Sequence, residues 1–117
     1  MVKPKDFQLV RLNNLKEFVI DLMTDMDVWS ETKTQDLSNI KLGLLRSNAT
    51  QRHGVTRWKR GVNLSKLSPS DVEVIDIHPQ LLEDEWKAYA AFVLHHEYIH
   101  ALGYRSHDAK FRFLDFL

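Results

Sequence analysis

The chain has 117 residues, enough for one domain with a single apolar core. Hydrophobic residues make up 44% of it and charged residues 27%, a balance typical of folded proteins rather than disordered ones. No apolar run reaches the roughly 18 residues of a membrane span, and charges and Pro4 interrupt the N-terminus where a signal peptide would be apolar. Cysteine is absent, which excludes disulfides, thiol catalysis and cysteine-ligated zinc. We therefore expect one intracellular domain over residues 1–117.

The first element expected is an amphipathic helix over residues 6–26. Its apolar residues recur at steps of three and four: Leu9, Leu12, Leu15, Phe18, Val19, Leu22 and Met26. A loop follows over residues 27–38. Three short runs then alternate as strands do, at residues 40–45, 54–60 and 72–78. Because the links are too short for crossover helices, a small, mostly antiparallel three-stranded sheet is expected.

The net charge is zero, but the middle of the chain is basic. Residues 41–70 contain no Asp or Glu and seven basic residues: Lys41, Arg46, Arg52, Arg57, Lys59, Arg60 and Lys66. Trp58 lies between Arg57 and Lys59, a pattern that suits phosphate binding with a base stacked on the ring. The run Arg57, Trp58, Lys59, Arg60 is therefore a candidate DNA-binding site. The alternative is a solvated hairpin with Trp58 packed inward.

The second long helix, over residues 86–102, is the clearest element. Acidic residues precede it, where the helix dipole favours negative charge: Glu83, Asp84 and Glu85. Gly103 follows at the position where a left-handed residue ends many helices. Ser106 is the expected N-cap of a short last helix that carries Phe111, Leu114 and Leu117. Together these elements predict an α+β fold.

The pentapeptide His96-Glu97-Tyr98-Ile99-His100, an HExxH motif, lies inside this second helix. Residues four apart on a helix lie one turn above each other, about 5–6 Å apart at Cβ. His96 and His100 can therefore bind one tetrahedral zinc ion. Glu97 flanks such a metal without binding it, and can take a proton from a zinc-bound water. The alternative is a helix with two unrelated histidines.

A catalytic zinc needs a third protein ligand and one open position. His107 is the expected third ligand, because Gly103 permits a turn back towards the helix and His107 begins the next one. Asp108, His78 and a distant carboxylate are the alternatives.

The remaining polar residues near the motif have weaker signals. His95 projects about 100° around the helix from His96 and cannot share its metal, so a packing or surface role is expected. His53 is expected to be a solvated loop residue, with substrate binding as the alternative. Tyr104 and Arg105 are candidates to stabilise an oxyanion in the transition state, with ordinary turn residues as the alternative.

The segment LHHEYIHALGYRSHDAKFR, residues 94–112, resembles the active-site region of the SprT-like (Spartan-related) zinc metalloproteases. In that family HExxH is followed by a third His before a Phe-containing helix. Residues 52–57 and 78–82 are similar to its hairpin and edge strand, so the resemblance covers about residues 40–113. It implies a minimal zincin fold, one zinc per chain held by His96, His100 and His107, and Glu97 as general base. It also implies that an edge strand near residues 72–77 aligns a peptide substrate.

Family members act on proteins crosslinked to DNA, and some carry an additional zinc-binding or DNA-binding segment. This chain departs from that pattern, since it has no cysteine for a zinc ribbon. The prediction is a zinc-dependent endopeptidase, a hydrolase acting on peptide bonds of a protein or peptide substrate, with DNA as a candidate partner of residues 41–70. The alternative is a nucleic-acid-associated or partner-docking zinc domain without catalysis, against which the intact Glu97 argues. A membrane partner is not expected, and the location expected is cytoplasmic, or nucleoid or nuclear if DNA is bound.

Overall fold

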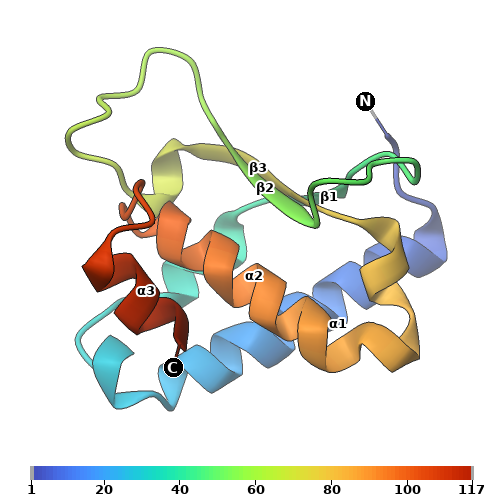
Figure 1. Ribbon diagram of the computed structural model, residues 1–117, viewed down its shortest axis with the longest axis horizontal. Helices are drawn as coiled ribbons and strands as arrows, with labels where there is room; N and C mark the ends of the chain where they lie inside the picture. The colour runs from blue at the N-terminus through green and yellow to red at the C-terminus, as the bar shows by residue number, and fades with distance from the viewer. Residues whose placement is uncertain (1, 117) are drawn as a thin grey trace.

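The computed structural model describes residues 2–116 (Figure 1). Within this range the α-helices are α1 (Asp6–Thr24), α2 (Lys87–Ala101) and α3 (Ala109–Phe116), and the strands are β1 (Leu42–Leu44), β2 (Gly54–Trp58) and β3 (Val72–Ile77). Short 3₁₀ turns connect several of them. The predicted α+β architecture of two long helices, a small three-stranded sheet and a short last helix is confirmed. Leu117, predicted to belong to the last helix, lies outside the described residues.

The sheet has the order β1-β3-β2, so β3 is its central strand. β2 runs antiparallel to β3 from Gly54↔Ile77 onward, as expected. β1 runs parallel to β3. The sequence pattern did not indicate this pairing, since parallel strands are usually joined by a helix and the link between β1 and β3 contains β2 instead. The expectation that residues 72–77 form an edge strand is therefore wrong. β2 is the free edge on the side that faces α2.

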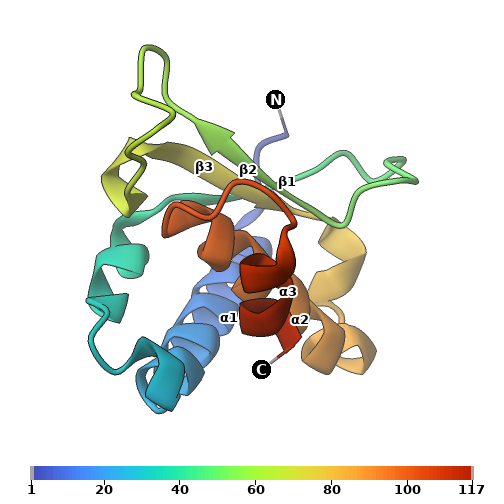
Figure 2. The same ribbon diagram turned by 60° about the vertical axis from the view of Figure 1, so that its left-hand side comes forward.

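Both long helices cover one face of the sheet, and α3 packs against α2 (Figures 1 and 2). The core between these layers is apolar: Leu12, Leu15, Val19, Met23, Leu42, Leu44, Ile75, Ile77, Leu94, Tyr98, Ile99, Phe111 and Leu114 are all buried. Each such side chain stabilises the fold by about 1.5–3 kcal/mol relative to its exposed state. Within residues 2–116, no helix is both long enough and apolar enough to cross a membrane. The core thus fixes α2 beneath β2, and this contact forms the candidate site.

Candidate metal centre

The last turns of α2 carry the predicted metal ligands. The imidazole rings of His96 and His100 lie one turn apart, with centroids separated by 5.1 Å. After Leu102 ends the helix, Gly103 adopts a positive φ of 113°, as predicted, and its amide donates to the His100 carbonyl oxygen. A residue with a Cβ would be strained in this conformation. The turn directs the following loop back across the end of α2 and brings His107 to the other two histidines.

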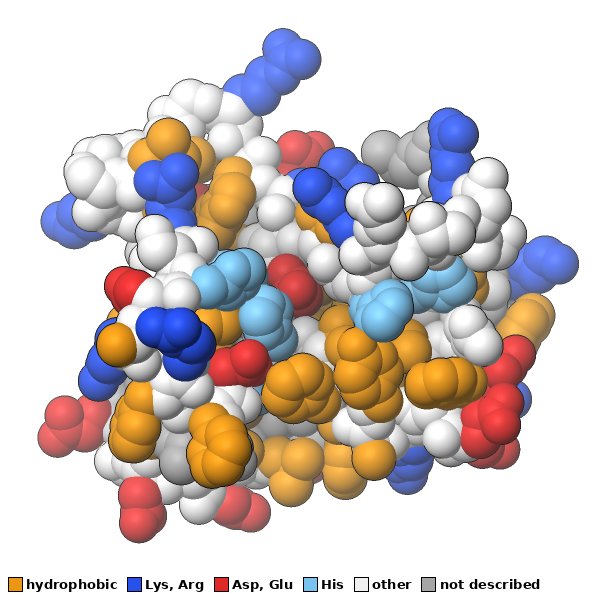
Figure 3. All heavy atoms as spheres, in the orientation of Figure 1, with side chains coloured by type: hydrophobic (Ala, Val, Ile, Leu, Met, Phe, Trp, Pro, Cys, Tyr) orange, Lys and Arg blue, Asp and Glu red, His pale blue; other side chains and the backbone are white. Residues whose placement is uncertain are grey.

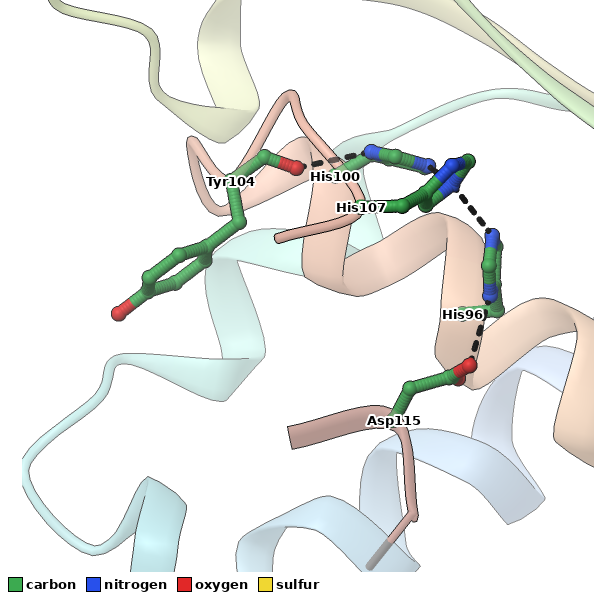
Figure 4. A network of polar contacts seen from close by, with 5 residues as sticks. All are labelled: His96, His100, Tyr104, His107 and Asp115. Atoms are coloured by element: carbon green, nitrogen blue, oxygen red, sulfur yellow. Dashed lines mark hydrogen bonds and ion pairs between the residues drawn. The ribbon is translucent and has the colours of Figure 1, made fainter. Parts of the chain in front are cut away.

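The three histidines converge on one point (Figure 4). The Nε2 atom of His107 lies 3.1 Å from Nε2 of His100 and 3.2 Å from Nε2 of His96. One ligand atom from each residue lies within 4.8 Å of the other two, a grouping that can hold a metal ion. Two nitrogens bound at about 2.0–2.1 Å to a tetrahedral zinc are roughly 3.3 Å apart, close to the observed separations. The His96, His100 and His107 set, which we call the metal cluster, therefore fits zinc.

Hydrogen bonds on the far side of the rings set the tautomers. The Nδ1 atom of His100 lies 2.8 Å from the carbonyl oxygen of Tyr104, which can only accept, so Nδ1 carries the proton. The Nδ1 atom of His96 likewise donates to Oδ2 of Asp115 on α3, 3.0 Å away. In the neutral rings both Nε2 atoms are then unprotonated and direct their lone pairs toward His107. Lone pairs that converge in this way repel one another unless a metal ion lies among them or Nε2 of His107 carries a proton that it donates to one of them.

Phe111 supports the metal cluster from below. It is buried, and its ring centroid lies 4.8 Å from that of His96, 4.5 Å from that of His100 and 4.9 Å from that of His107. The helix that carries Phe111 is capped by Asp108, whose Oδ1 accepts from the Phe111 amide at 2.9 Å. Ser106 is therefore not the N-cap, contrary to expectation. The carboxylate of Asp108, an alternative third ligand in the sequence, caps α3 and is not among the three residues that converge.

Glu97 lies beside the metal cluster and is only 7% exposed. The hydroxyl of Thr56 on β2 donates to Oε1 of Glu97 at 2.8 Å. Gly54 allows this close approach of β2, because a Cβ at that position would lie 2.8 Å from Cγ1 of Val93 and 3.1 Å from Cγ of Glu97. The edge strand therefore fixes the orientation of the carboxylate that the sequence assigns to proton transfer.

Burial also shifts the titration of two histidines on α2. Desolvation lowers the pKa of His100, opposed by its hydrogen bond to the Tyr104 carbonyl and by the nearby Glu97. Desolvation likewise lowers the pKa of His95, opposed by Asp115. His95 is buried away from the metal cluster, as predicted, and its Nε2 accepts a hydrogen bond from Nε1 of Trp29 at 3.3 Å. Both rings therefore favour the neutral form.

An open cleft of about 520 Å³ lies between β2 and α2, with the metal cluster and Glu97 in its lining. Arg105 and His53, two residues with weaker sequence signals, also line it. The Tyr104 ring does not: it packs against the core and points away from the three histidines (Figure 4), so its hydroxyl is not placed to meet an oxyanion in the cleft. His78 is buried elsewhere, where Nδ1 accepts from the Gln80 amide, and is not one of the three histidines that converge.

The candidate DNA-binding residues are not brought together as a single face. The Nε atom of Arg57 donates to Oδ2 of Asp76 at 2.8 Å, which partly neutralises its charge. Trp58 is half-buried against the core and borders the cleft, while Lys59 and Arg60 are exposed at the start of the loop that projects from β2 (Figure 1). The structure therefore supports the inward packing of Trp58 that was the alternative prediction.

The sequence did not indicate that Asp115 and Thr56 belong to the site. Each is one acidic or hydroxyl residue among many, and neither lies at a fixed spacing from the HExxH motif. Their partners, His96 and Glu97, lie 19 and 41 residues away in the chain. The one available signal was that each lies in a predicted element bordering the motif.

Comparison with known proteins adds no assignment. No protein-family model matches this chain, and no curated protein or solved structure matches it either. The metal cluster, its hydrogen-bonded surroundings and the cleft are therefore the grounds for a functional conclusion.

Proposed function

We propose that this chain is a zinc-dependent endopeptidase of the SprT-like type. The observation that carries the proposal is the convergence of three histidine Nε2 atoms beside the Glu97 carboxylate, in the lining of an open cleft. His96, His100 and His107 would hold the zinc, and the ion would supply Lewis acidity to a water molecule and to the scissile carbonyl. Three protein ligands leave the fourth position free, as a catalytic site requires.

The chain's own residues then account for the proton transfers. Glu97 accepts a proton from the attacking water and passes it to the leaving amine. The Thr56 hydroxyl holds Oε1 of Glu97 in position throughout. Among residues 2–116, β2 pairs with β3 on one side only, so its other edge can pair with an extended peptide that lies along the cleft. The substrate edge proposed is thus β2, in place of the strand expected from the sequence.

Association with DNA is a second proposal, favoured by one observation. Arg52, Arg105 and Trp58 line the same cleft as the metal cluster, and Lys59 and Arg60 are exposed next to it. A nucleic acid bound to these residues would hold a crosslinked protein near the cleft.

The Glu97→Gln variant separates metal binding from catalysis. It should keep its zinc, since Glu97 is not a ligand, and lose nearly all cleavage of a denatured protein substrate. His100→Ala should lose both the zinc and the activity. Cleavage by Glu97→Gln at the wild-type rate would show that the proposed mechanism is wrong.

A further inference from the structure

The cleft continues beyond the metal cluster along α2, where its wall is aromatic. Phe92 and Tyr89 line the cleft together with His96, and Trp86 precedes them at the start of the helix. These side chains remain 48%, 37% and 37% exposed, respectively. They recur every three residues, a spacing that places neighbours on one face of a helix. Figure 3 shows hydrophobic side chains side by side over the first half of α2, next to the histidines.

The three aromatic residues, which we call the aromatic row, form a continuous surface. The rings of Tyr89 and Phe92 stack with their centroids 6.1 Å apart, and Trp86 meets Tyr89 edge-on at the same distance. The hydroxyl of Tyr89 is hydrogen-bonded to Nδ1 of His53, 2.6 Å away, at the residue before β2. The row is therefore held in place from the opposite wall of the cleft.

We propose that the aromatic row is a specificity subsite that binds aromatic or large aliphatic side chains of the substrate. The proposal rests on the proposed peptidase function and names the class of peptide that it takes. Tyr89 and Phe92 line the cleft and Trp86 extends their surface beyond it, and a contiguous apolar surface that enters a cleft indicates a ligand rather than solvent. Because the row lies in the same cleft as the metal cluster, the ligand we propose for it is the substrate peptide.

The geometry sets the register of this subsite. At about 1.5 Å per residue along α2, Phe92 lies roughly 6 Å and Tyr89 roughly 10 Å from His96. An extended peptide advances about 3.3 Å per residue, so the row meets side chains roughly two to four residues from the scissile bond. Gly54 approaches Val93 as well as Glu97, and Thr56, further along β2, bonds to Glu97, so β2 and α2 run in the same direction. A peptide on the β2 edge would therefore pass over the row on one side of the metal only.

Charge argues for a peptide and against a nucleic acid at this row. The residues immediately before Trp86 are acidic and exposed: Glu83, Asp84 and Glu85. These carboxylates repel phosphates, whereas they tolerate an apolar or basic peptide. The basic residues of the cleft, Arg52 and Arg105, come from the loop before β2 and the loop after α2.

The test combines cleavage with binding. Wild-type enzyme digests a denatured protein, and mass spectrometry of the fragments maps the cleavage sites. Aromatic or large aliphatic residues should be enriched two to four positions from the cut, on one side only. For a peptide of that sequence, the Tyr89→Ala/Phe92→Ala double variant should lose about tenfold or more in kcat/KM. The counterpart peptide with Ser at that position should change by less than about twofold. Phe7→Ala is the matched control, because Phe7 is an exposed aromatic residue outside the cleft.

Binding to the zinc-loaded Glu97→Gln variant provides a readout without catalysis. A short fluorescein-labelled peptide with two Phe residues should bind more tightly than its Ser counterpart in an anisotropy titration, and the Tyr89→Ala/Phe92→Ala changes should abolish the difference. If no substrate is cleaved but this difference is found, the peptidase function fails and the subsite stands. If cleavage occurs without side-chain preference and both peptides bind equally, the subsite is overturned. Loss of single-stranded DNA binding in the double variant, with peptide binding unchanged, would also overturn it.

Discussion

The metal cluster and the basic segment over residues 41–70 differ in how their side chains are held. In the metal cluster, His96 and His100 each have a hydrogen-bond partner behind the ring, and Phe111 packs against all three imidazoles. In the basic segment, Arg57 is engaged by Asp76, Trp58 is half-buried, and Lys59 is exposed on a projecting loop. A site that must hold a metal needs fixed ligands, whereas a surface that attracts phosphates needs only charge.

Among changes outside the three histidines, Asp115→Asn should have the largest effect on the metal cluster. The change removes the negative charge that accepts the His96 Nδ1 proton, and zinc affinity should fall about 10- to 100-fold. Competition with a chromophoric chelator measures it. Asp21→Asn, an exposed acid on α1, is the control. Equal zinc affinity in Asp115→Asn and the wild type would mean that the hydrogen bond behind the ring does not tune the site.

Thr56→Val tests whether β2, on the opposite wall of the cleft, fixes the Glu97 carboxylate as firmly as the histidines are fixed. The variant keeps the shape of the side chain but cannot donate to Glu97, so kcat should fall about tenfold with little change in KM or zinc content. Thr56→Ser retains the hydroxyl and should restore most of the rate. If Val and Ser variants are equally active, the hydroxyl does not position Glu97.

The stability of the metal-free protein should depend on pH through the buried histidines. Burial lowers the pKa of His95 and of His100, so below about pH 6.5 the unfolded chain binds protons that the folded chain does not. Stability should therefore be full above that pH and decline as the pH falls further. Urea unfolding in chelator at about pH 7.5 and pH 5.5 measures the decline. His95→Gln, which keeps an acceptor for Trp29 and does not titrate, should reduce it; a midpoint that rises on acidification contradicts the account.

The smallest effect on the metal cluster is expected from changes in the basic segment. Single-stranded DNA should bind more weakly as salt rises, because neutralised phosphates release counterions. Reversing Arg57, Lys59 and Arg60 to Glu should abolish binding and leave the zinc in place. Trp58→Ala should cost about 1–3 kcal/mol of binding if a base stacks on the ring, and should appear as lost stability if the ring only packs inward. Flat anisotropy curves at both low and high salt would show that the chain does not bind single-stranded DNA.

These two regions also show what the sequence could reveal. Helical periodicity places His96 and His100 one above the other whatever the rest of the fold does, and Gly103 marks the turn that returns His107. By contrast, strand order depends on long-range pairing, so the central position of β3 had no local signal. The same holds for Asp115 and Thr56, whose contacts join elements far apart in the chain. The N-cap of α3 was expected at Ser106, and the contact with the Phe111 amide shows that it is Asp108.

Metal content is the most direct test of the metal cluster. Elemental analysis of the purified wild type should give about one zinc per chain, removable by chelator and restored by reconstitution. His107→Ala should lose that zinc, while His53→Ala should keep it, because His53 lines the cleft but lies outside the cluster. No bound transition metal after reconstitution, or equal zinc in His107→Ala and the wild type, would contradict the three-histidine site.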